Sequence, residues 1–380
     1  MAYWTGPTVS AIVASLRTRV TYDATKCSIV LLETRAPRNV RARRLNIVKM
    51  PYSARTRASP PRLTREDYTV GWVCALPIEL AAAQEMLDEE HQSLPQDADD
   101  SNTYTLGRMG EHNVVIACLP AGQTGNNSAA SVVVQMKLGF NAIRFHLIVG
   151  IGGGVPNSGQ DVRLGDVVVS QPLKEHGGVV QYDLGKATPS GFTRTGFLNA
   201  PPTILLSAVA SLRARQLRRR VDLSSHLSRL SSLPDFTRDN AGPDILFEAA
   251  YRHAGGAGCE QCNEEKVVHR KPRGQEIMIH CGTIASGNQV MRDGEMRDRV
   301  SAELGGVLCF EMEAAGLMNN FPCIVVRGIC DYADSHKNKK WQAYAAGTAT
   351  ACAKEILSMI RGAKVAKEPP AEEVVEQKHG

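Results

Sequence analysis

Apolar segments of strand length alternate with segments of helical character along most of this chain. The first clear strand pattern runs from Tyr68 to Ala75. Pro77 follows at a position suited to a first helical turn, and strong helix formers continue to Leu87. The same reasoning predicts further strands at 113–118, 145–149, 166–170, 276–281 and 323–329, and further helices at 126–137, 309–319 and 341–360.

Apolar strands that alternate with helices are typical of a sheet covered on both faces. The sequence therefore predicts an α/β protein of three layers, with helices on either side of a central mixed sheet, over residues 66–362. Residues 211–243 interrupt the rhythm with an Arg-, Ser- and Leu-rich stretch that we interpret as a surface insertion. Residues 363–380 contain Pro369-Pro370 and many charges, which predicts a solvated tail.

The first 65 residues differ from the rest in charge. Residues 1–64 hold 12 Lys and Arg against 2 Asp and Glu, and the remainder holds 32 against 37, so the net charge of +5 comes from the N-terminus. This basic segment has the composition of a mitochondrial transit peptide. We favour instead a disordered leader, or a wrongly assigned translation start with Met50 as the true first residue. Its apolar run 29–32 is not continued by a pattern that predicts an element.

Composition excludes several classes of protein. A chain with 43% hydrophobic and 22% charged residues is neither fibrous nor fully disordered. No run approaches the ~18 apolar residues of a membrane span, and the mildly acidic body gives no basis for binding nucleic acid. The ten cysteines lie mostly in apolar segments, which is typical of reduced thiols in a cytoplasmic protein. A mitochondrial location applies if residues 1–64 are a transit peptide.

A glycine loop, Gly150-Ile151-Gly152-Gly153-Gly154-Val155-Pro156, is expected directly after the strand at 145–149. Glycines at the carboxyl end of a strand let backbone N–H groups approach a ligand closely. The loop does not match the dinucleotide fingerprint, because Val155 replaces the third small residue and Pro156 breaks the receiving helix. The segment 122–128 at a helix start suits either an anion site or a tight turn with a polar cap.

Acidic residues occupy two further places that suit chemistry. Glu311 and Glu313 lie at the start of the helix predicted at 309–319. Residues i and i+2 of a helix do not share a face, so only one of them is expected to face a ligand. Asp331 follows the strand predicted at 323–329, and acids at the carboxyl ends of strands are well placed for catalysis in open α/β sheets.

A metal site is a weaker interpretation of the segment Cys259-Glu260-Gln261-Cys262, with His253 and His269 nearby. The spacing matches part of a zinc-ligand set. A second cysteine pair is missing, and the neighbouring glycines indicate a loose loop. We therefore expect neither a metal nor another cofactor.

Six motifs in order resemble the nucleoside phosphorylase/nucleosidase superfamily, in the version found in fungal multidomain proteins. No single motif is specific, and the resemblance rests on their order over about residues 66–362. The motifs are Cys74-Ala75-Leu76-Pro77-Ile78-Glu79, Gly150-Ile151-Gly152-Gly153-Gly154, Leu164-Gly165-Asp166-Val167-Val168-Val169-Ser170, Ile284-Ala285-Ser286-Gly287-Asn288-Gln289, Phe310-Glu311-Met312-Glu313-Ala314 and Arg327-Gly328-Ile329-Cys330-Asp331.

The resemblance implies cleavage of the N-glycosidic bond of purine nucleosides or nucleotides, through a transition state in which the ribose resembles an oxocarbenium ion. It also implies a homo-oligomer in which a neighbouring subunit helps to close the site. Asp331 matches the acid toward the leaving base, and Glu79 matches the residue that activates water in hydrolytic members. By the same matching, the ribose is held by Met312 and Glu313, the base lies against Val290, Met291 and Cys330, and the glycine loop is formed by Gly150, Ile151, Gly152 and Gly153.

Departures from the family pattern favour hydrolysis over phosphorolysis. Ile151 stands where related enzymes often carry Ser, Ile148 stands where phosphorylases place Arg, and the segment 76–79 lacks the arginine of a phosphate site. An anionic nucleophile without a cationic partner is poorly held. The alternatives are a phosphorolytic purine nucleoside phosphorylase and a non-catalytic nucleotide-sensing module. For a nucleotide substrate, the cations in candidate loops are Lys186, Arg194, Arg292 and Arg297.

Overall fold

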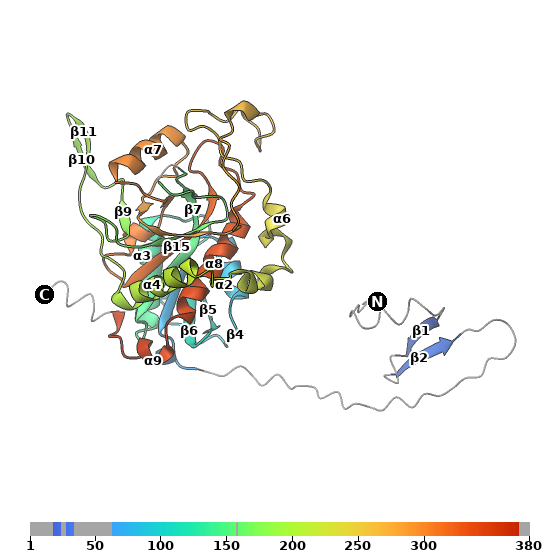
Figure 1. The fold of residues 1–380 in the computed structure, drawn as a ribbon. Helices are drawn as coiled ribbons and strands as arrows, with labels where there is room; N and C mark the ends of the chain where they lie inside the picture. Colours follow the sequence, from blue (N-terminus) through green and yellow to red (C-terminus); the bar gives the residue numbers. More distant parts are fainter. Residues whose placement is uncertain (1–17, 24–27, 34–62, 157–158, 372–380) are drawn as a thin grey trace. The chain divides into compact units, whose positions relative to one another are not determined.

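The apolar segments form one mixed β-sheet in the computed structural model, which describes residues 18–23, 28–33, 63–156 and 159–371 (Figure 1). Its main path runs β12-β8-β15-β7-β3-β6-β5-β4, and β14, β13 and β9 attach beside β7. The strands are β3 (Val70–Cys74), β4 (Glu89–Glu90), β5 (Tyr104–Met109), β6 (His112–Cys118), β7 (Phe145–Gly154), β8 (Val167–Ser170), β9 (Val179–Gln181), β12 (Ile279–Gly282), β13 (Ile284–Ser286), β14 (Cys309–Glu311) and β15 (Cys323–Asp331). A separate hairpin joins β10 (Gly185–Thr188) and β11 (Gly191–Arg194).

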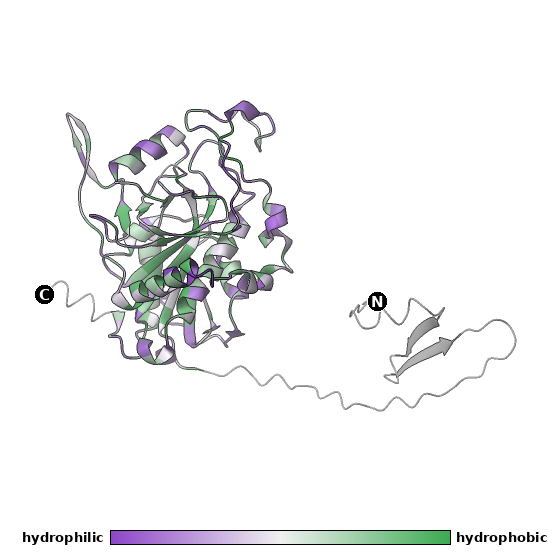
Figure 2. Ribbon diagram, viewed as in Figure 1, coloured by the Kyte–Doolittle hydropathy of each residue, from purple (hydrophilic) through white to green (hydrophobic). Residues whose placement is uncertain are grey.

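Helices cover both faces of this sheet, as predicted. Side chains alternate along β3, so that Trp72 enters the core shared with α2, α4 and α8, whereas Val73 enters the core shared with α3. Hydrophobic residues accordingly gather on the central strands in Figure 2. The helices are η1 (Arg65–Asp67), α2 (Pro77–Glu85), α3 (Asn126–Gly139), α4 (Thr203–Leu217), α5 (Ser224–Leu227), η2 (Ser228–Leu230), η3 (Pro234–Phe236), α6 (Arg238–Ala241), η4 (Glu264–Lys266), α7 (Gly294–Glu303), η5 (Ala314–Gly316), α8 (Gln342–Ser358) and α9 (Gly362–Val365).

The helix predicted at 309–319 is wrong. Residues 309–311 form strand β14, and only the short helix η5 follows. Cys309 and Phe310 pair with Gly154 and Gly153 of β7, and the same strand pairs in parallel with β13. These long-range strand pairings outweigh the helix preference of the local sequence.

The predicted glycine loop is also wrong, because the glycines continue strand β7 to Gly154. Gly150 and Gly152 pair with Arg327 and Ile329 of β15. A side chain at Gly150 would collide with the Glu79 carboxylate, and one at Gly153 would lie 2.8 Å from an oxygen of Asp331. The glycines therefore make room for the protein's own acids.

Residues 211–243, interpreted from the sequence as a surface insertion, also contribute to the core. Leu212 of α4 and Leu223 and Leu230 of the following segment are buried in the core shared with α8. At the C-terminal end, α9 contributes buried Val365, and residues 372–380 lie outside the described residues.

In the N-terminal segment, β1 (Thr18–Asp23) and β2 (Ser28–Glu33) form an antiparallel pair where the sequence pattern predicted no element. Most of the expected leader lies outside the described residues.

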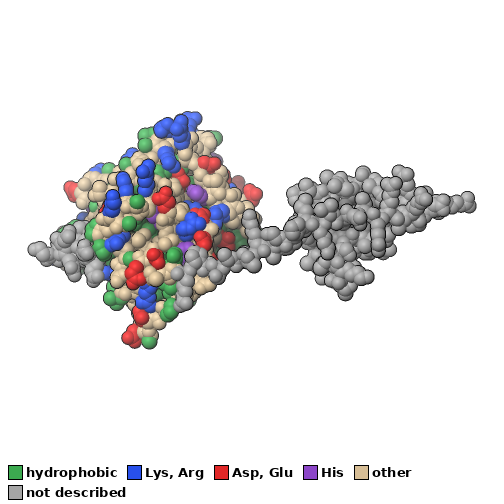
Figure 3. Space-filling view, turned by 90° about the horizontal axis from the view of Figure 1, so that it is seen from below, with side chains coloured by type: hydrophobic (Ala, Val, Ile, Leu, Met, Phe, Trp, Pro, Cys, Tyr) green, Lys and Arg blue, Asp and Glu red, His purple; other side chains and the backbone are tan. Residues whose placement is uncertain are grey.

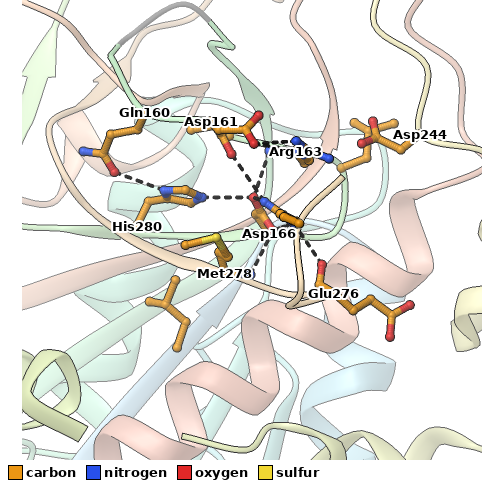
Figure 4. A network of polar contacts seen from close by, with 12 residues as sticks. Gln160, Asp161, Arg163, Asp166, Asp244, Glu276, Met278 and His280 are labelled. Carbon is orange, nitrogen blue, oxygen red and sulfur yellow. Dashed lines mark hydrogen bonds and ion pairs between the residues drawn. The ribbon is translucent and has the colours of Figure 1, made fainter. Parts of the chain in front are cut away.

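A fully buried carboxylate, Asp166, ties the start of β8 to the edge strand β12 (Figure 4). It accepts hydrogen bonds from the backbone N–H groups of Arg163 (2.8 Å) and Met278 (2.9 Å) and from His280 Nε2 (2.9 Å). The guanidinium of Arg273 completes the cluster. Burial alone would raise the pKa of Asp166, but its bonds to His280 and Arg273 hold that pKa below its ordinary value.

The surface carries charges of both signs. On the face seen in Figure 3, basic and acidic side chains are interspersed. Among the described residues, none of the helices combines the length and apolar character needed to cross a bilayer.

The contact between α8 and β15 depends on Gly328. A β-carbon added there would overlap the backbone carbonyl of Ala345 in α8, which cannot move independently of its helix. We expect Gly328→Ala to lower the free energy of unfolding by about 3 kcal/mol or more, measured by urea denaturation. The matched control is Gly139→Ala at the end of α3, where the nearest atom is 3.7 Å away and little change is expected. Equal stability of the two variants would contradict this account of the packing.

Candidate active site

A pocket opens beside the C-terminal halves of β7 and β15. Its walls come from α2, β7, the loop before α7, β14 and β15, which are far apart in the sequence. Of the residues predicted as site residues, those that line it are Glu79, Ile151, Gly152, Gly153, Val290, Met291, Met312, Glu313, Cys330 and Asp331. Gly150 lies directly behind the Glu79 carboxylate, and Cys259 and Cys262 lie outside this pocket.

Arg327 is a buried cation that forms ion pairs with two glutamates of the site. It lies in the middle of β15 and is 1% exposed. Its Nη2 contacts Glu311 Oε2 at 2.5 Å and Glu313 Oε2 at 3.2 Å. A guanidinium removed from water in this way is tolerated only when carboxylates compensate its charge. Burial alone would lower the pKa of Arg327, but the surrounding carboxylates hold it far above its ordinary value.

Glu311 and Glu313 both face the pocket, so the expectation that only one does is wrong. The rule for a helix does not apply, because Glu311 ends strand β14 and Glu313 lies in the turn that follows it, at the start of η5. Glu311 is also fixed by the backbone N–H groups of Glu313 (3.1 Å) and Ala314 (3.1 Å to Oε2). It therefore holds Arg327 and the turn at 313–314, and leaves Glu313 nearer the open space.

Glu79, in the first turn of α2, is 2% exposed and holds its carboxylate between two backbone segments. Oε2 accepts from the N–H groups of Ala75 (2.7 Å) and Leu76 (3.0 Å), and Oε1 accepts from Ile151 (2.8 Å). Burial raises the pKa of Glu79, and the charge of Arg327 and these N–H groups offset the rise only in part. A carboxylate with a raised pKa is a stronger base than one in water.

The start of α3 donates to the protein's own acid. Gly125 N–H reaches Glu313 Oε1 at 3.3 Å, so this helix start binds a carboxylate side chain. The expected polar cap is absent, because the N-cap is Gly125 with a φ of +94°. Asn126 instead accepts from Gly316 N–H (3.1 Å) and ties α3 to η5.

Asp331 ends β15 and is held in a tight turn. Its Oδ1 accepts from Ala333 N–H (2.9 Å), and its Oδ2 accepts from Lys337 Nζ (2.7 Å). Ala333 has a φ of +52°, a conformation that costs a non-glycine residue about 1–2 kcal/mol. Burial alone would lower the pKa of Lys337, but the charge of Asp331 raises it above its ordinary value.

Sequence reasoning gave no role to Lys337 or Arg327, and it named Glu311 only as one of two acids of which one would face a ligand. A charged residue inside the apolar run 323–329 is the one signal that identifies Arg327, because a buried charge requires a partner. Among the cations considered for a nucleotide, Arg297 is buried and donates to the carbonyl of Tyr332 (2.8 Å). None of those four cations lines the pocket.

Comparison with known families gives a match to the phosphorylase superfamily over residues 69–361. A nucleotide-binding leucine-rich repeat (NLR)-like protein of Hyaloscypha variabilis is 49% identical over 304 residues, which are 79% of this chain and 30% of that protein. The chain thus spans about a third of that fungal relative. A 5′-methylthioadenosine/S-adenosylhomocysteine nucleosidase of Mycobacterium tuberculosis is 26% identical over 77% of this chain and 96% of its own length.

More distant likenesses agree with this match. A death domain-containing ATP nucleosidase of Amphimedon queenslandica is 22% identical over 68% of this chain and 42% of its own length. Among solved structures, the futalosine hydrolase of Helicobacter pylori has a TM-score of 0.50 and 18% identity over 78% of this chain and 98% of its own. At that identity, the likeness supports the fold alone.

The crowding of acids makes Glu313 sensitive to pH. Burial, with the charges of Glu311 and Glu79, raises the pKa of Glu313 to about 7 despite the nearby Arg327. The folded protein therefore binds this proton more tightly than the unfolded chain, and the group's contribution to stability falls as pH rises from about 4.5 to 7. Glu313→Gln removes this pH-dependent loss. The melting temperature of the variant minus that of the wild type should therefore be larger at pH 8 than at pH 5.

The control for this measurement is Glu295→Gln on the exposed face of α7. Its melting temperature relative to the wild type should be the same at both pH values. A Glu313→Gln difference that is equally flat would show that the Glu313 carboxylate is ionised throughout.

Proposed function

This chain belongs to the phosphorylase superfamily, and from that premise we propose that it hydrolyses the N-glycosidic bond of purine nucleosides or nucleotides. The observation that carries the proposal is the buried carboxylate of Glu79, which faces the pocket with a raised pKa. A base in this position activates a water molecule, which is the nucleophile of a hydrolase.

The charge of the pocket favours water over phosphate. Four carboxylates line it, from Glu79, Glu311, Glu313 and Asp331. Lys337 is the sole cation among the described lining residues, and it is already paired with Asp331. Arg327 is turned toward the glutamates. Phosphate would therefore meet net negative charge without a free cationic partner, whereas neutral water and sugar hydroxyls meet hydrogen-bond acceptors.

We assign the residues the following roles. Glu79 takes a proton from water as the water oxygen bonds to C1′ of the ribose. Glu313 accepts hydrogen bonds from the ribose hydroxyls, and Met312 packs on the sugar. The bond from C1′ to the purine breaks, and Asp331 gives a proton to the ring nitrogen of the departing base. The products are the free purine and ribose or its phosphate.

The ion pair with Lys337 refines the role of Asp331. Its Oδ2 accepts a hydrogen bond from the ammonium group of Lys337, so this oxygen is already occupied in the free protein. Lys337 Nζ, 2.7 Å away, is the adjacent proton-bearing group, so separation of this pair is part of the catalytic cycle.

Adenine is the base we propose, because the relatives named above include nucleosidases of methylthioadenosine and of ATP. Val290 is 53% exposed, so the wall expected to hold the base is open to solvent. That opening suits the predicted homo-oligomer, in which a second subunit covers the site, and light scattering of the active protein tests it. The activity of any longer protein that contains this chain is part of the same proposal.

The reaction type is tested by incubating the protein with adenosine, methylthioadenosine, AMP, ATP and guanosine, with and without phosphate. We expect release of the base and of a reducing sugar in the absence of phosphate, and loss of turnover in Glu79→Gln. A strict requirement for phosphate would identify a phosphorylase. Tight nucleotide binding without release of base would identify a sensor.

The acid role is tested by Asp331→Asn, which removes the transferable proton and nearly preserves the shape of the side chain. Turnover should fall by about a hundred- to ten-thousand-fold, with a much smaller change in substrate affinity. The matched control is Asp244→Asn outside the pocket, which loses the ion pair with Arg270 while its amide oxygen can still accept from the Tyr332 hydroxyl, and it should stay within a few-fold of the wild type. A folded Asp331→Asn protein with near-normal turnover would refute the assignment.

A further inference from the structure

The segment 243–278, between α6 and β12, follows a long path with η4 as its one regular element (Figure 1). From 251 to 270, Gly258 and Cys262 are its two buried residues. Long loops without secondary structure of their own are uncommon in compact domains. Ordering each residue costs about 1–2 kcal/mol of backbone entropy, which hydrophobic burial within this stretch does not offset. Another interaction must hold the segment.

Three potential metal ligands converge there. His253, Cys259 and Cys262 each offer one ligand atom, and these atoms all lie within 4.8 Å of one another. Both cysteines are free thiols. Ligand atoms around a tetrahedral zinc ion lie about 3.3–3.8 Å apart, so a closure of about 1 Å forms the site. We propose that these three residues bind one zinc ion, with His336 as the fourth ligand.

The hydrogen bonds of His253 suit this role. The N–H of Gly255 donates to its Nδ1 (3.1 Å), so the ring proton is on Nε2, which donates to the carbonyl of Gly258 (2.9 Å). Histidine ligands of zinc commonly donate the other ring N–H to a backbone carbonyl in this way. The lone pair of Nδ1 is then the one that meets the metal, in place of the weak bond from Gly255.

His336 supplies what the sequence lacked, since no second cysteine pair exists nearby. Its side chain is 7% exposed, and neither ring nitrogen has a hydrogen-bond partner among the described residues. The ring stacks on Phe247 at 4.1 Å. Its centroid lies 5.4 Å from that of His253, at an interplanar angle of 79°. His336 also lines the same cavity as both cysteines, although its nitrogens are not among the three converging ligand atoms. Two imidazoles on one tetrahedral zinc ion have centroids about 5 Å apart, so the His336 ring must turn toward the cysteines to complete the site.

The ion would stabilise the turn that carries the proposed acid. The backbone N–H of His253 donates to Ser335 Oγ (3.0 Å), and the backbone N–H of His336 donates to the buried Asp334 Oδ1 (2.9 Å). A cavity lined by both cysteines also includes Asp331. Zinc would therefore tie the segment 251–270 to the turn 331–336 from outside the pocket. It is a structural ion, because all four positions are filled by protein.

The experiment measures metal content in the full chain, purified without chelator and without a metal-affinity tag. Elemental analysis by plasma mass spectrometry should give about one zinc per chain. Cys259→Ser and Cys262→Ser should each lose most of it, and His336→Ala should weaken zinc binding at least tenfold. The matched control is Cys281→Ser in β12, a half-buried thiol outside the segment, which should retain the metal.

Cobalt substitution gives a second readout, independent of turnover. Cobalt in the wild-type protein should show the absorption of a tetrahedral site with thiolate ligands, and Cys259→Ser should lower it. Zinc-free wild-type protein that takes up neither metal would overturn the proposal. So would a disulfide between Cys259 and Cys262, detected by mass spectrometry of unreduced peptides. Retention of full affinity by His336→Ala would remove His336 from the ligand set.

Discussion

The burial of one guanidinium constrains the whole site. Arg327 lies in a central strand, where no water reaches it, so the fold must bring carboxylates to it. They come from β14 and the turn after it, with Glu79 of α2 adding its charge nearby. The same contacts therefore compensate the buried charge of Arg327 and set the arrangement of the acids in the pocket. The same charge lets three acids remain close to one another without full mutual repulsion.

The layered fold could be predicted because long apolar strands and well-formed helices carry their pattern locally. β3, β6 and α8 all lie close to their predicted positions, and β7 begins where predicted but continues through the glycines. Short pieces such as β13 and β14 could not, since three residues hold no periodicity and their pairing partners lie far away in the chain.

The site residues show the same division. The sequence predicted the acids of the pocket through motif order, and the structure brings Glu79, Glu313 and Asp331 to one cavity. Their partners were missed, because Lys337 meets Asp331 only through a turn with positive φ at Ala333. The relation of Glu311 to Glu313 was misjudged for a related reason. The pair was placed on one helix, whereas Glu311 ends a strand and Glu313 lies in the turn after it, so the error in the element became an error about which acids face the pocket.

The glycines of β7 have a consequence for how this chain tolerates mutation. Each of Gly150 and Gly153 faces a carboxylate that occupies the space of the missing side chain. Substituting either one would displace Glu79 or Asp331 while leaving the acid itself unchanged. A mutational scan would therefore rank these glycines with the acids, because a substitution at either one moves a carboxylate of the pocket. Positions of β7 that tolerate no side chain therefore mark the space that Glu79 and Asp331 occupy. Repositioning either acid by design would have to start with these glycines.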